Sequence, residues 1–163
     1  MWPFNRKTSN VPRDPGAYQH VLSALEPAEV NALGGLPGEA IVGTFLDPKH
    51  TLESFRVNPV FVAFLHRVIS THSSVSPELA KAASEMHTGH LYIIDWRTLN
   101  PNGAVPPEDI IGAIEVKDGL LVGGSYQPNP NYRVLTARGM TRLTPHQREA
   151  FVDALPRVKG QTI

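Results

Sequence analysis

The sequence contains no cysteine in its 163 residues. That absence excludes disulfide bonds, zinc–thiolate sites and a cysteine nucleophile, and it is typical of a reducing compartment, so we expect a cytoplasmic protein. Long apolar runs are also missing, since no stretch approaches the roughly 20 residues of a membrane-spanning helix and the first residues lack the apolar core of a signal peptide. We therefore expect a soluble protein without a membrane span.

Charge is scarce and balanced. Charged residues make up 18% of the chain, whereas about a quarter is usual. The 15 Lys and Arg residues cancel the 15 Asp and Glu residues, and zero net charge argues against nucleic acid as the main partner. Basic residues gather from Asn131 onward and acidic ones between Ser76 and Asp118. We expect these two regions to pack near each other and to neutralise locally.

Proline and glycine, by contrast, are abundant, with 15 and 13 residues. They indicate many turns and short elements. A hydrophobic content of 41% over this length supports one sizeable core. We expect a single α+β domain from residue 14 to residue 157, after a flexible N-terminal segment of residues 1–13 and before a tail of residues 158–163.

Helix signals occur in the first half of the chain and again at its end. They consist of capping residues, prolines at first helical positions and apolar residues at helical spacing. The run of residues 60–70 is long enough for the core helix, although its β-branched and aromatic residues also suit a strand. The first expected helix runs from Asp14-Pro15 to Leu25, and the second ends at Gly34-Gly35. The third covers residues 60–70, the fourth follows Ser76 as far as Gly89, and the fifth follows Thr144.

Strand signals follow Gly89, after a first strand expected at residues 40–46. Asp118-Gly119 lies between two apolar runs and predicts a two-residue hairpin turn. Pairing about this turn places Val116 opposite Leu121. We expect an antiparallel meander of about four or five strands, on which about four helices pack.

One pattern resembles a catalytic motif. Asp95 ends an apolar run, and Glu115 and Lys117 lie on one face of the next predicted strand. This resembles the Asp and Glu-x-Lys arrangement of PD-(D/E)xK nucleases. The resemblance implies that Asp95 and Glu115 hold Mg²⁺ or Mn²⁺ while Lys117 orients or activates water. In that family a helix typically follows the Glu-x-Lys strand, whereas here a turn follows Lys117.

Histidines are the other candidate metal ligands, since the chain has seven. Four of them would have to converge from separate helices and a strand to form a site. The glycine at position 89 separates the closest two, so we expect no metal site from His66, His72, His87 and His90.

The stretch from residue 124 to residue 134 suits recognition of another molecule. Two prolines limit the freedom of the loop before binding, and tyrosine and arginine supply large contact areas with directional hydrogen bonds. A plain connection covering the sheet edge remains the alternative. The candidate binding residues are Tyr126, Gln127, Asn129, Asn131, Tyr132 and Arg133.

Taken together, these patterns favour a non-enzymatic binding protein that contacts another protein or a peptide. A small accessory or inhibitory partner of bacterial type fits this description, and it needs no cofactor. This prediction is reached by elimination, because no motif identifies the class directly. A metal-dependent nuclease or phosphodiesterase that uses Asp95, Glu115 and Lys117 remains the alternative.

Overall fold

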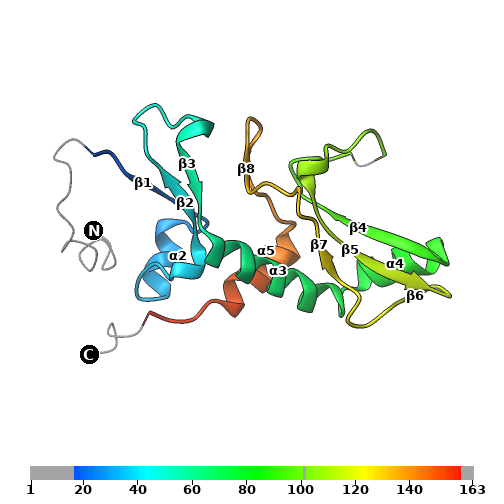
Figure 1. Ribbon diagram of the computed structural model, residues 1–163. Coiled ribbons are helices and arrows are strands. Elements are labelled where there is room, and N and C mark those ends of the chain that lie inside the picture. Colours follow the sequence, from blue (N-terminus) through cyan, green and yellow to red (C-terminus); the bar gives the residue numbers. More distant parts are fainter. Residues whose placement is uncertain (1–16, 101, 159–163) are drawn as a thin grey trace. The chain divides into compact units, whose positions relative to one another are not determined.

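The computed structural model describes residues 17–100 and 102–158 (Figure 1). The chain divides into two compact units, the first comprising Met1–Phe61 with Leu155–Ile163 and the second comprising Val62–Ala154. The expected segment 1–13, the helix start at Asp14-Pro15 and tail residues 159–163 lie outside the described residues. A single folding domain from residue 14 to residue 157 stays a prediction, because compact units in one chain do not decide whether each folds alone.

The first unit is built on a small antiparallel sheet with the order β1-β2-β3. The middle strand β2 is buried at four of its five residues, because it has a neighbour on each side. Its apolar side chains form the core of this unit together with Leu25. The elements are β1 (His20–Ser23), α2 (Pro27–Ala32), β2 (Ile41–Phe45) and β3 (Phe55–Val57).

The helix predicted between Asp14 and Leu25 is wrong in its described part, where the chain forms β1. Apolar residues at positions 18, 21, 22 and 25 fit a helical period, but so short a helix is marginal on its own. Pairing with β2 supplies the backbone hydrogen bonds instead, with Val21 opposite Thr44 and Leu22 opposite Gly43. A contact with a strand twenty residues away therefore overrides the local pattern.

The predictions for the next two elements are confirmed. Helix α2 ends before Gly34, whose φ of 78° is the left-handed conformation that glycine adopts readily. The strand expected at residues 40–46 is β2.

The second unit combines helices with two further sheets (Figure 1). The boundary between the units falls inside α3, whose first three residues belong to the first unit. The elements are α3 (Pro59–Ser73), α4 (Pro77–Met86), β4 (Gly89–Ile94), β5 (Ile110–Lys117), β6 (Leu120–Leu121), β7 (Gln127–Pro128), β8 (Leu135–Thr136), β9 (Gly139–Met140) and α5 (Pro145–Ala154).

Helix α3 is the expected core helix of the second unit. Phe64, Leu65, Val68 and Ile69 are buried at the spacing of one helical face. The opposite face is exposed, although residues 60–70 are apolar nearly all round. The Phe64 ring meets Phe151 of α5 edge-on, with ring centroids 5.2 Å apart.

The caps of the other two helices are also as predicted. Ser76 accepts a hydrogen bond from the Leu79 backbone N–H at the start of α4. At α5, Thr144 and Gln147 form a reciprocal capping box, in which each side chain accepts from the other residue's backbone N–H. Both helix starts were therefore encoded locally.

The hairpin between β5 and β6 is confirmed in its register. Val116 pairs with Leu121, and Asp118 and Gly119 both have positive φ, 51° and 77°. This is the backbone of a type I′ turn, which matches the twist of antiparallel strands.

The α+β class is confirmed, but the single meander is wrong. The strands form three sheets. The first contains β1–β3, the second contains β4–β7 with β7 paired to β5, and the short β8–β9 hairpin forms the third. Pro128 and Pro130 lack the backbone N–H that a continuous ladder needs, so they interrupt the sheet between β7 and β8. Within residues 17–100 and 102–158, no helix is long and apolar enough to cross a membrane.

Candidate functional site

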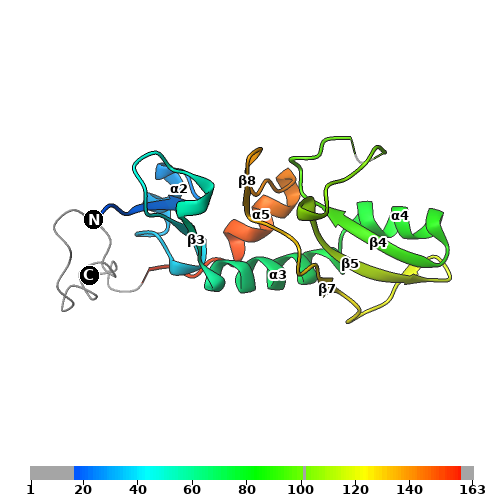
Figure 2. The same cartoon turned by 45° about the horizontal axis from the view of Figure 1, so that its top comes forward.

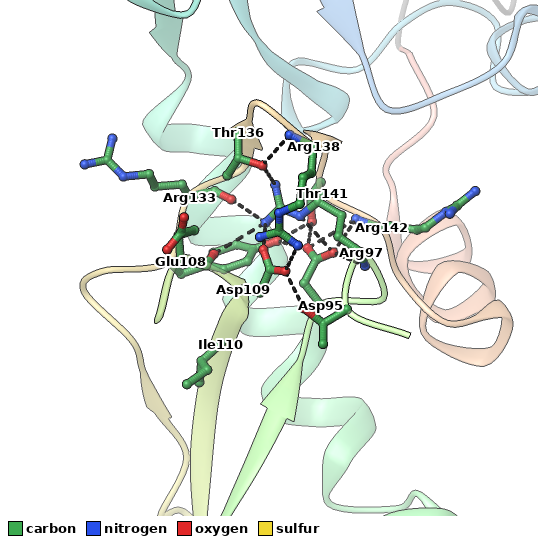
Figure 3. A network of polar contacts seen from close by, with 12 residues as sticks. Asp95, Arg97, Glu108, Asp109, Ile110, Arg133, Thr136, Arg138, Thr141 and Arg142 are labelled. Carbon is green, nitrogen blue, oxygen red and sulfur yellow. Dashed lines mark hydrogen bonds and ion pairs between the residues drawn. The ribbon is translucent and has the colours of Figure 1, made fainter. Parts of the chain in front are cut away.

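Asp95 directly follows β4 and lies at the centre of a buried polar cluster (Figure 3). Its side chain is fully buried. Oδ1 accepts from the backbone N–H and the Nε of Arg97, at 2.9 and 3.1 Å. Oδ2 accepts from the hydroxyls of Tyr132 and Thr141, at 2.7 and 3.0 Å, and the Arg142 backbone N–H lies within reach of both oxygens. Both oxygens of this carboxylate are thus engaged by donors from the chain.

Asp109, the residue before β5, forms the other half of the cluster. Its Oδ2 accepts from Arg138 Nη1 and from the Thr98 hydroxyl, both at 2.6 Å, and its Oδ1 lies 3.3 Å from Arg97 Nη2. Burial raises the pKa of Asp109, but the hydrogen bonds from Arg138 and Thr98 and the charge of Arg97 outweigh it, so the pKa is lowered. Asp109 is therefore held as a carboxylate.

Arg97 ties the two carboxylates to the β8–β9 hairpin. Its guanidinium group contacts both Asp95 and Asp109 and also donates to the backbone carbonyls of Arg133 and Gly139, at 2.7 and 3.0 Å. The Arg97 side chain is 3% exposed, so these contacts take place out of water. The cluster holds the end of β4, the start of β5 and the hairpin in one arrangement.

The cluster also shows the local neutralisation that the charge distribution led us to expect. Arg138 of the basic C-terminal region pairs with Asp109 of the acidic region. The Arg138 side chain is 42% exposed, so this ion pair reaches the surface.

The predicted metal ligands do not converge. Glu115 pairs with His90 near the start of β4, whereas Asp95 follows the opposite end of that strand. Five residues along a strand separate the two levels by roughly 16 Å. Lys117 and Glu115 do share an exposed face of β5, as predicted. In the described part of the chain, no group of three or more His, Asp or Glu side chains is placed to hold a metal ion.

His66 has a structural contact that the sequence did not reveal. Its Nδ1 lies 2.7 Å from the Tyr126 hydroxyl, which joins α3 to the segment before β7. Burial lowers the pKa of His66 and raises that of Tyr126. Both groups are thus held neutral near pH 7.

The predicted recognition loop is divided between inward and outward residues. The hydroxyl of Tyr132 contacts Asp95 and Thr141 in the buried cluster, and burial with the nearby Asp95 charge raises the Tyr132 pKa. Asn129 Nδ2 donates to the Ile110 carbonyl at 2.8 Å. Tyr126, Asn129 and Tyr132 therefore serve the fold, and the exposed members are Gln127, Asn131 and Arg133.

The first unit contains an open groove of about 710 Å³ that the sequence reading missed. It is lined by residues 36–39, 41, 43–44, 56–60 and 156–158, so its walls come from separate parts of the sequence. Val57 and Val60 are 49% and 53% exposed there, flanking Asn58-Pro59. The apolar lining consists mainly of Leu36, Pro37, Ile41, Val57, Val60 and Val158.

Two arginines border this groove, and Glu39 is the acidic residue in its lining. Arg56 Nη1 donates to the Glu53 carbonyl at 2.9 Å, and Arg157 Nη1 donates to the Ala32 carbonyl at 3.0 Å. Among residues 17–100 and 102–158, neither guanidinium group forms an ion pair with a carboxylate. Both arginines are exposed and keep donors free for an anionic group.

No protein-family model, curated protein or solved structure matches the chain. The candidate features are therefore the buried cluster, the groove and the exposed residues of the loop before β8. The two carboxylates of the cluster are fully buried and paired with arginines, whereas the groove is open and apolar.

Proposed function

We propose that this protein is a non-enzymatic, cytoplasmic binding protein that holds an apolar peptide segment of a partner protein in the groove of its first unit. It acts as an accessory or inhibitory partner. The observation that carries this proposal is the open apolar groove of about 710 Å³ bordered by two arginines without a carboxylate partner in the described chain.

The volume and the lining both suit a ligand. Ligand pockets usually measure about 300–1,000 Å³ and are lined by apolar side chains with a few polar groups that fix orientation. Covering Val57 and Val60 would stabilise a complex, because fully burying a valine side chain is worth about 1.5–3 kcal/mol and about half of each residue is still exposed.

The charge around the groove favours an acidic segment. Arg56 and Arg157 outnumber Glu39, and a guanidinium group presents a planar fork of donors that matches a carboxylate. The segment we propose therefore contains apolar residues next to Asp, Glu or a free C-terminal carboxylate.

The buried cluster supports a scaffold rather than a catalyst. Asp95 accepts from several chain donors and Asp109 is paired with two arginines, so neither oxygen pair is presented to a substrate. Gln127, Asn131 and Arg133 remain a second candidate contact surface on the other unit.

Selection of random peptides against the full chain should yield apolar sequences that contain Asp or Glu. A Val60→Asp variant should bind the enriched peptide at least about tenfold more weakly, which corresponds to 1.4 kcal/mol, because a carboxylate would then stand in the apolar lining. Fluorescence anisotropy with the labelled peptide measures the change. The matched control is Val75→Asp, since Val75 is 75% exposed, lies outside the groove and should leave the affinity unchanged.

Replacing both Arg56 and Arg157 by alanine should remove the preference for acidic residues while keeping the preference for apolar ones. Peptides that bind wild type and Val60→Asp equally would place recognition elsewhere. Enrichment of basic peptides, or of none, would contradict the proposed ligand.

The alternative function, a metal-dependent nuclease, makes a different prediction. We expect no Mg²⁺- or Mn²⁺-dependent cleavage of plasmid DNA, single-stranded DNA or RNA, because Asp95 follows the end of β4 whereas Glu115 on β5 lies beside its start. Wild type and Glu115→Ala should be compared in the same assay. Cleavage that Glu115→Ala abolishes would establish the enzyme, since a contaminating nuclease would ignore the substitution.

A further inference from the structure

Strand β4 forms one edge of its sheet (Figure 2). The sheet order is β4-β5-β6, with β7 also pairing to β5, so β5 is the neighbour of β4 within the described chain. An edge strand offers a row of backbone donors and acceptors to a further strand.

The hydrogen bonds of β5 show which residues of β4 direct their backbone N–H and C=O groups away from β5. The Glu115 backbone N–H donates to Ser125 Oγ and its carbonyl accepts from Val122 N–H, both at 2.9 Å and both on the side away from β4. Hydrogen-bonding direction alternates along an antiparallel ladder. His90, which pairs with Glu115, therefore turns its own backbone groups away from β5, and so does Tyr92.

The same direction continues to the end of the strand. Pairing shifts by one residue between Ile93 and Ile94, and the Asp95 N–H then donates to the Asp109 carbonyl at 2.7 Å. Ile94 thus also turns outward. No hydrogen bond joins the outward groups of His90, Tyr92 and Ile94 to another residue of the described chain.

Nothing in the sequence of β4 protects this edge. Natural edge strands usually carry lysine, proline or inward-pointing charges that discourage pairing, whereas β4 reads Gly-His-Leu-Tyr-Ile-Ile. Tyr92 is 57% exposed in the middle of the strand. The edge is therefore open to another strand.

We propose that this strand is β4 of a second copy of the chain, paired antiparallel about a two-fold axis through Tyr92. That register sets Tyr92 opposite Tyr92, His90 opposite Ile94, and Leu91 opposite Ile93. No charged residue faces another, and aromatic and β-branched cross-strand pairs are favourable. The zero net charge of the chain leaves no overall repulsion against self-association.

The interface is small, so the dimer is reversible. Two six-residue strands bury less than a standard interface, as is typical of weak and transient complexes. The inference does not rest on the proposed peptide groove. Together the two features give an assembly with two grooves, in which avidity for a repeated or dimeric partner exceeds the affinity of one groove.

Sedimentation velocity of the full chain over a range from low to high micromolar concentration tests the dimer. Wild type should show a monomer–dimer equilibrium. Tyr92→Lys should raise the dissociation constant at least about tenfold, because two lysines would meet at the axis. Leu120→Lys is the matched control, since Leu120 is 71% exposed on β6 and lies away from the β4 edge. Thermal unfolding of both variants verifies that they fold.

The absence of cysteine provides a second readout. Oxidised Tyr92→Cys should form a disulfide-linked dimer, whereas oxidised Leu120→Cys should not, because the register places the two copies of residue 92 side by side. A monomeric wild type at every concentration would overturn the proposal. So would a dimer that Tyr92→Lys leaves unchanged, or cross-linking that is equal at the two positions.

Discussion

Replacing Asp95 by alanine should lower the free energy of unfolding by about 3–5 kcal/mol, the loss expected when one partner of a buried ion pair is removed. Arg97 would stay buried at 3% exposure with its nearest carboxylate gone. The hydroxyls of Tyr132 and Thr141 would lose their shared acceptor. Urea unfolding followed by circular dichroism measures the change, and a variant that is unfolded in buffer fits the same expectation.

Asp95→Asn separates charge from shape. An amide NH₂ at the Oδ1 position would face the Nε–H of Arg97, and at the Oδ2 position it would face the backbone N–H of Arg142. We therefore expect Asn to recover only a small part of the loss. Glu115→Ala is the control, because an exposed substitution usually changes stability by no more than about 0.5 kcal/mol. If Asp95→Ala were as stable as this control, the cluster would not be what holds the second unit together.

Local structure was predictable where one short segment decides it. Asp118-Gly119 fixed the hairpin register, since type I′ turns need residues that tolerate positive φ. Thr144 with Gln147 marked the start of α5, because a capping box needs only those two residues. These signals act over two to four residues and do not depend on the rest of the fold.

Contacts between distant segments were not predictable in the same way. The spacing of Val21 and Leu22 fits a helix, but both residues pair with β2, which lies about twenty residues later in the sequence. Asp95 could be taken for a metal ligand because the sequence does not show its hydrogen-bond partner Tyr132, which lies 37 residues away. Sequence spacing alone could not show that its carboxylate is already satisfied.

The candidate groove was hidden for the same reason. Its walls come from residues 36–44 and 56–60 together with residues 156–158, which lie about a hundred residues later in the sequence. The recognition loop was ambiguous in sequence, since tyrosine is favoured both at interfaces and in cores with a polar partner. The sequence marked Tyr126 and Tyr132 as residues with contacts, but it could not show that their hydroxyls contact His66 and Asp95 of the same chain.

Gly43→Ala should be the second strongly destabilising change, with a loss of about 3 kcal/mol, at the upper end of the usual cost of overpacking. A Cβ on Gly43 would lie 2.4 Å from the Arg56 carbonyl oxygen and 2.4 Å from the Phe55 ring. The carbonyl belongs to the backbone of β3, so it cannot move without disturbing the β2–β3 ladder that pairs Gly43 with Val57. Thermal or urea unfolding of the variant measures the loss.

Gly38→Ala is the matched control, because both glycines line the groove and nothing lies within 4 Å of a Cβ at Gly38. It should leave stability and peptide affinity near wild type. Gly43→Ala should reduce both, since β3 carries Val57 into the groove and shifts with the ladder. Equal stability of the two variants would show that the close β2–β3 approach is not needed. Loss of stability with full peptide affinity would show that the ligand does not depend on the β3 wall of the groove.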